Sequence, residues 1–251
     1  MKYVLSDIHG NLEAWESIKQ QIKLTTDDEL FILGDVIDRG TDGIVILKDI
    51  MNNQDNMHML LGNHEYMMMN VIGYPYSEND PELITPLKER KYLWYYNGGK
   101  VTHKEFLKQE IEVQKWIGEY LQSLPLEFVV KCGDTTFILV HANYSKVFEL
   151  CYPEEPEMVA NFAVWDRDNI EATMQILANS GENLRLVIGH TPTAHFNEEQ
   201  NEWPNEGDRL TVFKRDNLLA IDCGAAYPKN GGRLACIRLD DMKVFYSKES
   251  R

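Results

Sequence analysis

The sequence lacks the features that mark membrane-spanning, secreted and disulfide-stabilised proteins. No apolar run approaches the ~20 residues that a transmembrane helix needs, and residues 1–5 carry no signal-peptide pattern. The four cysteines are widely spaced and form no CxxC pair (Cys132, Cys151, Cys223 and Cys236). We therefore expect reduced thiols and no disulfide framework. These absences predict a cytoplasmic protein without a membrane partner.

Positive charge is also scarce. The chain has 25 lysines and arginines against 40 aspartates and glutamates, which gives a formal net charge of −15. A nucleic-acid-binding surface needs basic side chains that replace the counterions around the phosphates, so we expect no nucleic-acid partner. A phosphorylated substrate is compatible with this charge only where arginines or metal ions supply local positive charge.

The motifs of hydrolases that form a covalent intermediate are absent as well. The 251 residues contain no GxSxG nucleophile elbow and no CxxxxxR loop. The single serines and cysteines are most simply structural. Any hydrolytic chemistry is therefore expected to need no protein nucleophile.

The first 65 residues alternate between strands and helices. Apolar runs predict strands at 2–5, 30–33 and 57–61, and apolar residues at helical spacing predict helices at 12–22 and 44–51. Each of the three strands ends in a polar loop. This β-α-β pattern predicts a parallel sheet with right-handed crossovers in the first half of the chain.

Residues 66–124 depart from this pattern. Helical segments are expected at 87–96 and 103–124, separated by Asn97-Gly98-Gly99 and closed by Pro125. Four side chains are expected to give the segment an aromatic surface (Trp94, Tyr95, Tyr96 and Trp116). We expect a helical insertion or cap at about 66–124 on a single domain that spans 1–251. An ordinary helical layer of that domain is the alternative.

Short strands dominate the prediction for the second half of the chain (127–131, 136–140, 184–188, 210–213, 218–221, 233–238 and 243–246). An acidic, proline-rich loop occupies 153–157, and a helix is expected to end at about Leu177. Asn230-Gly231-Gly232 predicts a hairpin turn between two of the last strands.

Polar side chains that can ligate a metal follow five of the predicted strands. They are Asp7 and His9, Asp35 and Asp38, Asn63 and His64, His141, and His190. Because strand ends of such a sheet converge on one edge, we expect them to share a pocket. Carboxylates, imidazoles and amide oxygens together suit Mn²⁺, Fe or Zn²⁺ and fit Ca²⁺ poorly. Three other histidines receive no role (His58, His103 and His195).

The number of ligands predicts two metal ions. Six ligands exceed the needs of one transition metal, and sharing Asp35 would give a two-metal site with the ions ~3.5–4 Å apart. Such a site generates a hydroxide nucleophile at neutral pH and holds a phosphoryl group for in-line displacement.

Five motifs in order carry a family resemblance. They are Asp7-Ile8-His9-Gly10, Gly34-Asp35-Val36-Ile37-Asp38-Arg39-Gly40, Gly62-Asn63-His64-Glu65, His141-Ala142-Asn143 and Gly189-His190-Thr191. The set strongly resembles the calcineurin-like metallophosphoesterases. Within them it looks like the phosphoprotein phosphatases, of the phage lambda type and its bacterial relatives. The resemblance implies an α/β (α+β) fold, a four-layer α/β/β/α sandwich of two mixed sheets flanked by helices.

The resemblance also implies a role for each motif residue. Asp7, His9 and Asp35 would hold one metal. The other metal would be held by Asp35, Asn63, His141 and His190. A metal-bridging water would be the nucleophile, and Mn²⁺ is the first expectation, with Fe or Zn²⁺ as alternatives.

Four further residues would complete the chemistry. His64, oriented by Asp38, would be the general acid, since a carboxylate partner is expected to raise the pKa of an imidazole. Arg39 and Arg167 would bind phosphate oxygens, which suits the planar guanidinium group.

Three functions follow as expectations. The first is a metal-dependent phosphomonoesterase acting on phosphoserine or phosphothreonine in a protein, with phosphotyrosine or a small phosphoester as a further substrate. The second is a symmetrical dinucleoside polyphosphate hydrolase, which shares the metal ligands. The third is an inactive regulatory or binding domain on the same fold, against which the complete ligand set argues. Asp38 and Glu65 favour the first function, because the dinucleotide hydrolases typically lack the one and have Asp in place of the other.

Overall fold

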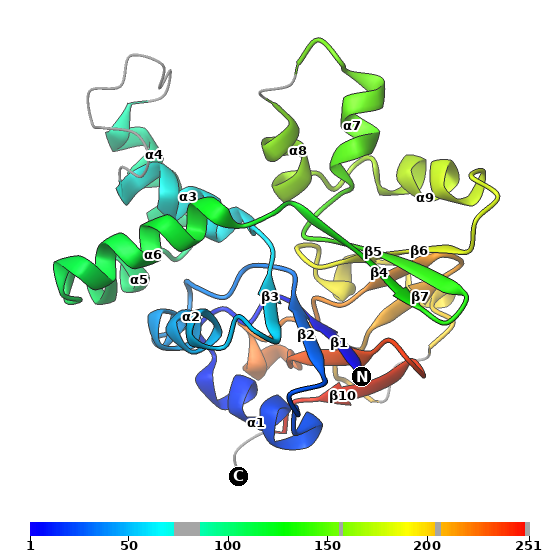
Figure 1. The fold of residues 1–251 in the computed structure, drawn as a ribbon, viewed down its shortest axis with the longest axis horizontal. Coiled ribbons are helices and arrows are strands. Elements are labelled where there is room, and N and C mark those ends of the chain that lie inside the picture. Colours follow the sequence, from blue (N-terminus) through cyan, green and yellow to red (C-terminus); the bar gives the residue numbers. More distant parts are fainter. Residues whose placement is uncertain (73–85, 156–157, 204–206, 249–251) are drawn as a thin grey trace.

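Two five-stranded mixed sheets pack face to face in the part of the chain that the structure describes (Figure 1). The structure is a computed structural model, and it describes residues 1–72, 86–155, 158–203 and 207–248. Helices flank both sheets. The predicted fold class, a four-layer α/β/β/α sandwich, is confirmed.

The first sheet is built from both ends of the chain. Its order is β10 (Lys243–Tyr246), β9 (Ala235–Arg238), β1 (Lys2–Leu5), β2 (Glu29–Ile32) and β3 (Met57–Met59). β1, β2 and β3 are parallel, as the β-α-β pattern predicts, whereas β9 pairs antiparallel with β1 and β10 pairs antiparallel with β9. The three parallel strands therefore end at the same edge.

The second sheet also contains three parallel strands. Its order is β4 (Glu127–Cys132), β5 (Thr135–Val140), β6 (Leu184–Ile188), β8 (Leu218–Ala220) and β7 (Phe213–Arg215). β5, β6 and β8 are parallel, and the two outer strands are antiparallel to their neighbours. Three more strand ends thus meet at one edge.

Alternation of side chains along each strand produces the four layers. Val4 of β1 faces the other sheet and belongs to the apolar core between the sheets, together with Leu139 and Val187. The neighbouring Leu5 faces the opposite way, into the core that α1 (Leu12–Ile22) and α2 (Gly43–Asn52) cover. On the far side of the sandwich, α9 (Ile170–Ala178) covers the second sheet. Strand periodicity of two explains why both faces of these sheets are apolar.

A group of helices between β3 and β4 lies to one side of the first sheet (Figure 1). It consists of α3 (Asn63–Ile72), α4 (Leu87–Tyr96), α5 (Lys100–Leu107) and α6 (Ile111–Ser123). The single helix expected at 103–124 is thus two helices. That this group is an insertion or cap on a single domain stays a prediction, and residues 73–85 of it lie outside the described part of the chain.

Trp94 of α4 corrects one expectation about that group. Its side chain is 0% exposed, so it is not part of an aromatic surface, whereas Tyr96 is 79% exposed. A helix that places one aromatic residue inward and its neighbours outward has two distinct faces, and the inner face of α4 points to the edge where the strands end.

One further expectation for the second half is wrong. Asn230-Gly231-Gly232 is not a hairpin turn, because β8 and β9 belong to different sheets, and Gly231 instead caps the short helix Pro228–Asn230 in a left-handed conformation. The segment after β5 contains two helices, α7 (Ser145–Cys151) and α8 (Val159–Trp165), around the acidic loop. Residues 156–157 of that loop lie outside the described chain. Over the residues described, no helix has the length and apolarity to span a bilayer.

Candidate metal centre

The loops after six parallel strands meet at one end of the sandwich. Backbone hydrogen bonds join them: His9 N donates to Asp35 O over 2.9 Å, and Gly189 N donates to His141 O over 2.9 Å. His190 N donates to Asp7 Oδ2 over 3.0 Å, which links the two sheets. The structure brings together all ten residues predicted for the site (Asp7, His9, Asp35, Asp38, Arg39, Asn63, His64, His141, Arg167 and His190). His58, His103 and His195 are not among the grouped ligand atoms.

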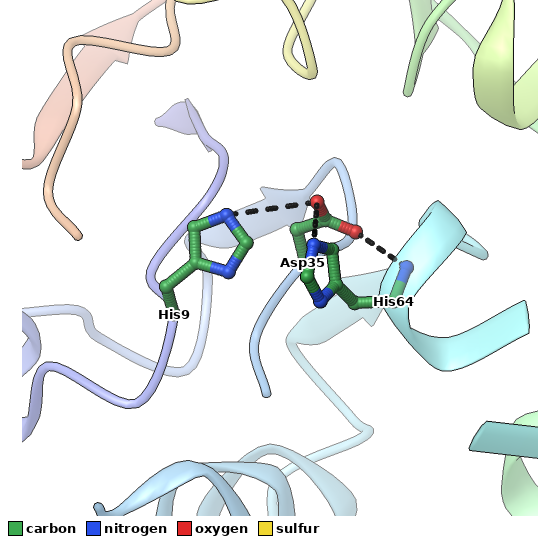
Figure 2. Close-up of side chains that lie close together, drawn as sticks. All are labelled: His9, Asp35 and His64. Atoms are coloured by element: carbon green, nitrogen blue, oxygen red, sulfur yellow. Dashed lines mark hydrogen bonds and ion pairs between the residues drawn. The ribbon is translucent and has the colours of Figure 1, made fainter. Parts of the chain in front are cut away.

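Asp35 lies between two groups of potential ligands. Its Oδ2 is 3.6 Å from His9 Nε2 and 3.8 Å from His64 Nε2, as Figure 2 shows. Its Oδ1 is 3.5 Å from His141 Nε2 on the other side. The ligand atoms of each group, one with His9 and His64 and one with His141 and His190, all lie within 4.8 Å of one another. The two carboxylate oxygens of Asp35 thus face different groups.

The spacing of these atoms fits metal ions. At 3.5–3.8 Å the nitrogens and oxygens are too far apart for hydrogen bonds. An ion about 2.0–2.2 Å from each atom fits between them. Asn63 Oδ1 adds a third kind of donor to the second group, since it lies 3.0 Å from both His141 Nε2 and His190 Nδ1. Carboxylate, imidazole and amide oxygen together match the donor set of a transition-metal site.

Backbone carbonyls fix the orientation of two imidazoles. His9 Nδ1 lies 3.1 Å from Ile37 O, and His141 Nδ1 lies 2.6 Å from Leu33 O. Because a carbonyl only accepts, each Nδ1 carries the proton and each Nε2 presents its lone pair toward Asp35. This outer hydrogen bond is the usual arrangement behind a ligating histidine.

Burial shifts the titration of the same groups. It lowers the pKa of His9 and of His141, so both imidazoles are neutral and able to ligate at pH 7. Burial, with the charge of Asp35, raises the pKa of Asp7 to about 6, and burial raises the pKa of Asp35 to about 7. Ionised carboxylates are costly here without a cation. The residues present therefore fit metal ions in charge as well as in geometry.

One arginine lies at each group. Arg39 Nη1 is 2.7 Å from His9 Nε2, and its Nη2 is 3.2 Å from His64 Nε2. Arg167 Nη2 donates to His190 O over 3.2 Å. Two guanidinium groups supply the local positive charge that an anionic substrate needs in a chain of net charge −15.

His64 is held from behind by a carboxylate. Its Nδ1 lies 2.6 Å from Asp38 Oδ2, and Asp38 N donates to Thr102 Oγ1 over 2.9 Å. The expectation that Asp38 raises the pKa of His64 is not met, because burial and the nearby Arg39 lower that pKa. Burial also raises the pKa of Asp38 to about 7. Asp38 therefore orients the imidazole rather than making it more basic.

Two buried acids, Glu65 and Asp222, also belong to the site, although the sequence pattern assigned neither of them a structural role there. Glu65 accepts hydrogen bonds from the backbone N–H groups of Asp35, over 2.8 Å, and of Val36, over 2.9 Å. Asp222 follows β8, and burial together with the charge of Asp7 raises its pKa to about 8. The rule that found the other strand ends also finds Asp222, since the apolar run at 218–221 precedes it. Glu65 holds the loop that carries Asp35.

The loops achieve this geometry with a left-handed backbone. A φ between 49° and 70° occurs at six of the ten predicted residues (Asp7, His9, Asp35, Asp38, Arg39 and His190). Side chains other than glycine rarely adopt this region. Gly62 permits the closest approach, because a Cβ there would lie 2.4 Å from both Asp35 N and Asp35 Oδ1.

The sequence pattern of one known family covers most of the chain. The pattern of the calcineurin-like phosphoesterases matches residues 3–222. The chain belongs to the calcineurin-like phosphoesterase family. This family membership implies a dimetal centre and a hydrolase of phosphoesters, in agreement with the ligand groups around Asp35.

One relative of this phosphoesterase resembles it in sequence along the whole chain, and two solved structures resemble it in fold. The symmetrical bis(5'-nucleosyl)-tetraphosphatase of Cronobacter sakazakii (strain ATCC BAA-894) is 32% identical over 284 residues, which cover 99% of this chain and 94% of that protein. A crystal structure provisionally assigned as a diadenosine tetraphosphatase has a TM-score of 0.56 at 14% identity, covering 98% of this chain and 91% of that one. A protein serine/threonine phosphatase from Saccharomyces cerevisiae has a TM-score of 0.58 at 13% identity, covering 100% and 80%. The two structural likenesses show the fold alone.

The expected phosphoserine/phosphothreonine phosphatase function is wrong. Curated relatives at about 30% identity over the full chain are symmetrical bis(5'-nucleosyl)-tetraphosphatases, which favours the second of the three functions. The expectation rested on Asp38 and Glu65. Both side chains bond to the protein itself, Asp38 to His64 and Glu65 to the Asp35 loop, so neither reports on the substrate.

Proposed function

We propose that this phosphoesterase cleaves dinucleoside tetraphosphates symmetrically. Water adds to one of the two inner phosphorus atoms, the central P–O–P bond breaks, and two nucleoside diphosphates leave. The observation that carries the proposal is the likeness to symmetrical bis(5'-nucleosyl)-tetraphosphatases along 99% of the chain.

The shape of the site supports a substrate with two long ends. A cavity of about 410 Å³ borders the first ligand group and is lined by His9, Arg39 and Thr41. A second cavity, of about 500 Å³, is lined by Trp165 and Arg167 beside the second group. Each cavity includes one of the two arginines. A tetraphosphate chain across the centre would reach toward both.

We assign the metal ligands as the family resemblance implies, with Asp7, whose Oδ1 lies 3.8 Å from His9 Nε2, in place of His64 in the first group. Asp7, His9 and Asp35 would hold one ion. The second ion would be held by Asp35, Asn63, His141 and His190. When bound, the ions supply an activated water and neutralise charge on the phosphoryl group. Mn²⁺ is the proposed metal, with Fe or Zn²⁺ as alternatives. A cytoplasmic location stays a prediction.

The arginines would bind and orient the phosphates. Arg39 lies within 3.2 Å of both His9 and His64, so a phosphate held by its guanidinium would lie next to the first group. Arg167, bonded to His190 O, would do the same beside the second group. His9 Nε2 cannot ligate an ion and contact Arg39 together, so Arg39 is expected to turn toward the phosphate.

His64 would donate a proton to the leaving diphosphate from its protonated form, which the negative charge of a phosphate chain next to Nε2 would favour against the lowered pKa of the imidazole. Its Nδ1 is fixed by Asp38, which leaves Nε2 facing the centre, 3.8 Å from Asp35 Oδ2. A diphosphate is a weaker base than the alkoxide of serine. Proton donation should therefore contribute less here than in a phosphoserine phosphatase.

Product analysis tests the proposal. Protein loaded with Mn²⁺ is incubated with diadenosine tetraphosphate, and the nucleotides are separated by anion-exchange chromatography. The expected product is ADP alone, with turnover abolished by a chelator and restored by added Mn²⁺. AMP with ATP would mean asymmetrical cleavage. No turnover of the dinucleotide with Mn²⁺, Fe or Zn²⁺ would overturn the proposed function.

A further inference from the structure

A cavity of about 500 Å³ lies beside the second ligand group and is lined by α7, α8 and the loop after α8. We call it the aromatic cavity. Its wall includes Phe148, Met158, Asn161, Phe162, Trp165 and Arg167. Figure 1 shows α7 and α8 standing beyond the end of the second sheet, on the side where β5 and β6 end. The volume exceeds that of one nucleoside.

The aromatic cavity lies next to the metal centre, because two residues of its wall contact His190. The Trp165 ring packs edge-on against the ring of His190, with the centroids 5.9 Å apart. Trp165 O also lies 3.3 Å from His190 Nε2. Arg167 belongs to the cavity wall and donates to His190 O over 3.2 Å. A molecule with a phosphate at the second ligand group is therefore within reach of this cavity.

The walls present flat, partly exposed apolar surfaces. The rings of Phe148 and Phe162, one from each helix, pack 5.0 Å apart and are half-buried. Met158 at the rim is 43% exposed. Aromatic faces of this kind are where nucleobases stack, and every base offers a π-face.

The wall of the aromatic cavity combines one cation with two carboxylates. Arg167 donates to His190 O at the metal centre, and Asp166 and Asp168 line the same wall. Carboxylates disfavour a second phosphate group beside them but tolerate a neutral base and ribose. Asn161 adds an amide that offers both a donor and an acceptor to a base edge.

The cavity beside the first ligand group is different. Among the described residues, its wall contains His9, Arg39, the carboxylates of Glu13 and Asp42, and backbone of Gly10 and Gly40, but no Phe, Tyr or Trp. Such a wall offers a base no aromatic face. The contrast identifies the aromatic cavity as the one with the chemistry for stacking.

We propose that the aromatic cavity binds one nucleoside of the substrate, with the base stacked against Phe162 and Trp165. The proposal rests on the proposed function for the identity of the substrate, and it adds the residues that would recognise the nucleoside. It assigns Phe162, which packs against Phe148 in the cavity wall, a role in affinity for the base.

Binding of ADP and of inorganic pyrophosphate to the Mn²⁺-loaded protein tests the proposal, because only ADP has a base. Calorimetric titration of Phe162→Ala is expected to give a ~5- to 100-fold weaker affinity for ADP, the usual magnitude of one base–aromatic stack. Affinity for pyrophosphate should stay within about twofold of the wild type. The KM for diadenosine tetraphosphate should rise in parallel with the dissociation constant for ADP.

Two further variants keep the result interpretable. Phe162→Leu retains apolar volume against Phe148 and removes only the aromatic face, so it guards against misfolding of Phe162→Ala. Tyr96→Ala removes an aromatic side chain that is 79% exposed on α4 and should leave both affinities unchanged. Wild-type affinity of Phe162→Leu and Phe162→Ala for ADP would overturn the proposal. Equal losses of ADP and pyrophosphate would also overturn it.

The two proposals fail in different ways. If the wild type does not cleave diadenosine tetraphosphate, the proposed function falls. In that case, the affinities of the Phe162 variants for ADP and for pyrophosphate still show whether the aromatic cavity binds a nucleoside. If the wild type cleaves the dinucleotide and the Phe162 variants bind ADP normally, only the nucleoside site falls.

Discussion

Trp94 donates its indole N–H to Asp38 Oδ2 over 2.7 Å, and the same oxygen lies 2.6 Å from His64 Nδ1. All three side chains are buried. Trp94 comes from α4, so a helix that lies outside the sheets fixes the carboxylate that orients the imidazole. Gly99 makes room for this contact, because a Cβ there would lie 2.2 Å from Trp94 Nε1.

Trp94→Phe should impair turnover without removing metal. The variant keeps an aromatic ring and deletes the donor to Asp38, a loss worth about 1–2 kcal/mol for a buried hydrogen bond. If the contact positions His64, kcat for diadenosine tetraphosphate falls ~10-fold while KM changes little. Trp116→Phe, in the same helical group, is the matched control. Wild-type kcat in Trp94→Phe would limit Trp94 to a structural role.

His64→Asn should retain its metals and lose activity. We expect a kcat ~10²-fold below wild type, the lower end for a general acid, because the leaving diphosphate needs less protonation than an alkoxide. Metal content by mass spectrometry and steady-state kinetics check this together. Since His64 also lies in the ligand group with His9, loss of one metal equivalent would make it a ligand instead.

Metal stoichiometry should separate Asp35 from His190. Asp35 faces both groups through its two oxygens, so Asp35→Ala is expected to lose about two metal equivalents per chain. His190→Ala removes a ligand of the second group alone and should lose about one. Equilibrium dialysis followed by elemental analysis gives both values. Equal losses in the two variants would argue against a shared Asp35.

Stability of the metal-free protein should fall as the pH rises from 6.5 to 8. Burial raises the pKa of Asp35 to about 7 and that of Glu65 and Asp222 to about 8, whereas carboxyls of the unfolded chain titrate near 4. In this window the folded state therefore binds more protons than the unfolded state, and stability decreases with pH. The buried histidines, whose pKa values are lowered, oppose the trend only near pH 6.5, where the unfolded imidazoles are about half protonated, and this opposition fades as the pH rises.

Thermal unfolding after chelation measures this effect. The metal-free midpoint should decline across the window, and added Mn²⁺ should flatten the profile because a cation favours the ionised carboxylates. A metal-free midpoint that stays level or rises between pH 6.5 and 8 would contradict the assignment of these buried acids.

The strand ends could be predicted because they follow a local rule. An apolar run such as 30–33, followed by Gly34 and Asp35, predicts where a buried strand ends. Parallel strands of one sheet end at the same edge, so the residues that follow them lie close together. The same rule would have found Asp222. This rule therefore predicts the grouping of the strand-end residues, whereas the sandwich and the place of Arg167 were expected only from the family resemblance.

Other features depend on contacts between distant residues. Nothing near Trp94 in the sequence says that its indole reaches Asp38, 56 residues away. Asn230-Gly231-Gly232 carries a hairpin signal, but the strands on either side find partners in different sheets. The substrate could not be read from Asp38 and Glu65, because these carboxylates bond to the protein itself.

The left-handed backbone at six site residues sets a limit on engineering this protein. Each such residue costs on the order of 1 kcal/mol, and glycine would relieve that cost at any of them. A selection for heat resistance alone is thus expected to accumulate glycines in these loops, because such a selection rewards stability and does not detect the loss of activity. Variants found in that way would fold better and hydrolyse nothing, so a useful selection has to reward turnover as well.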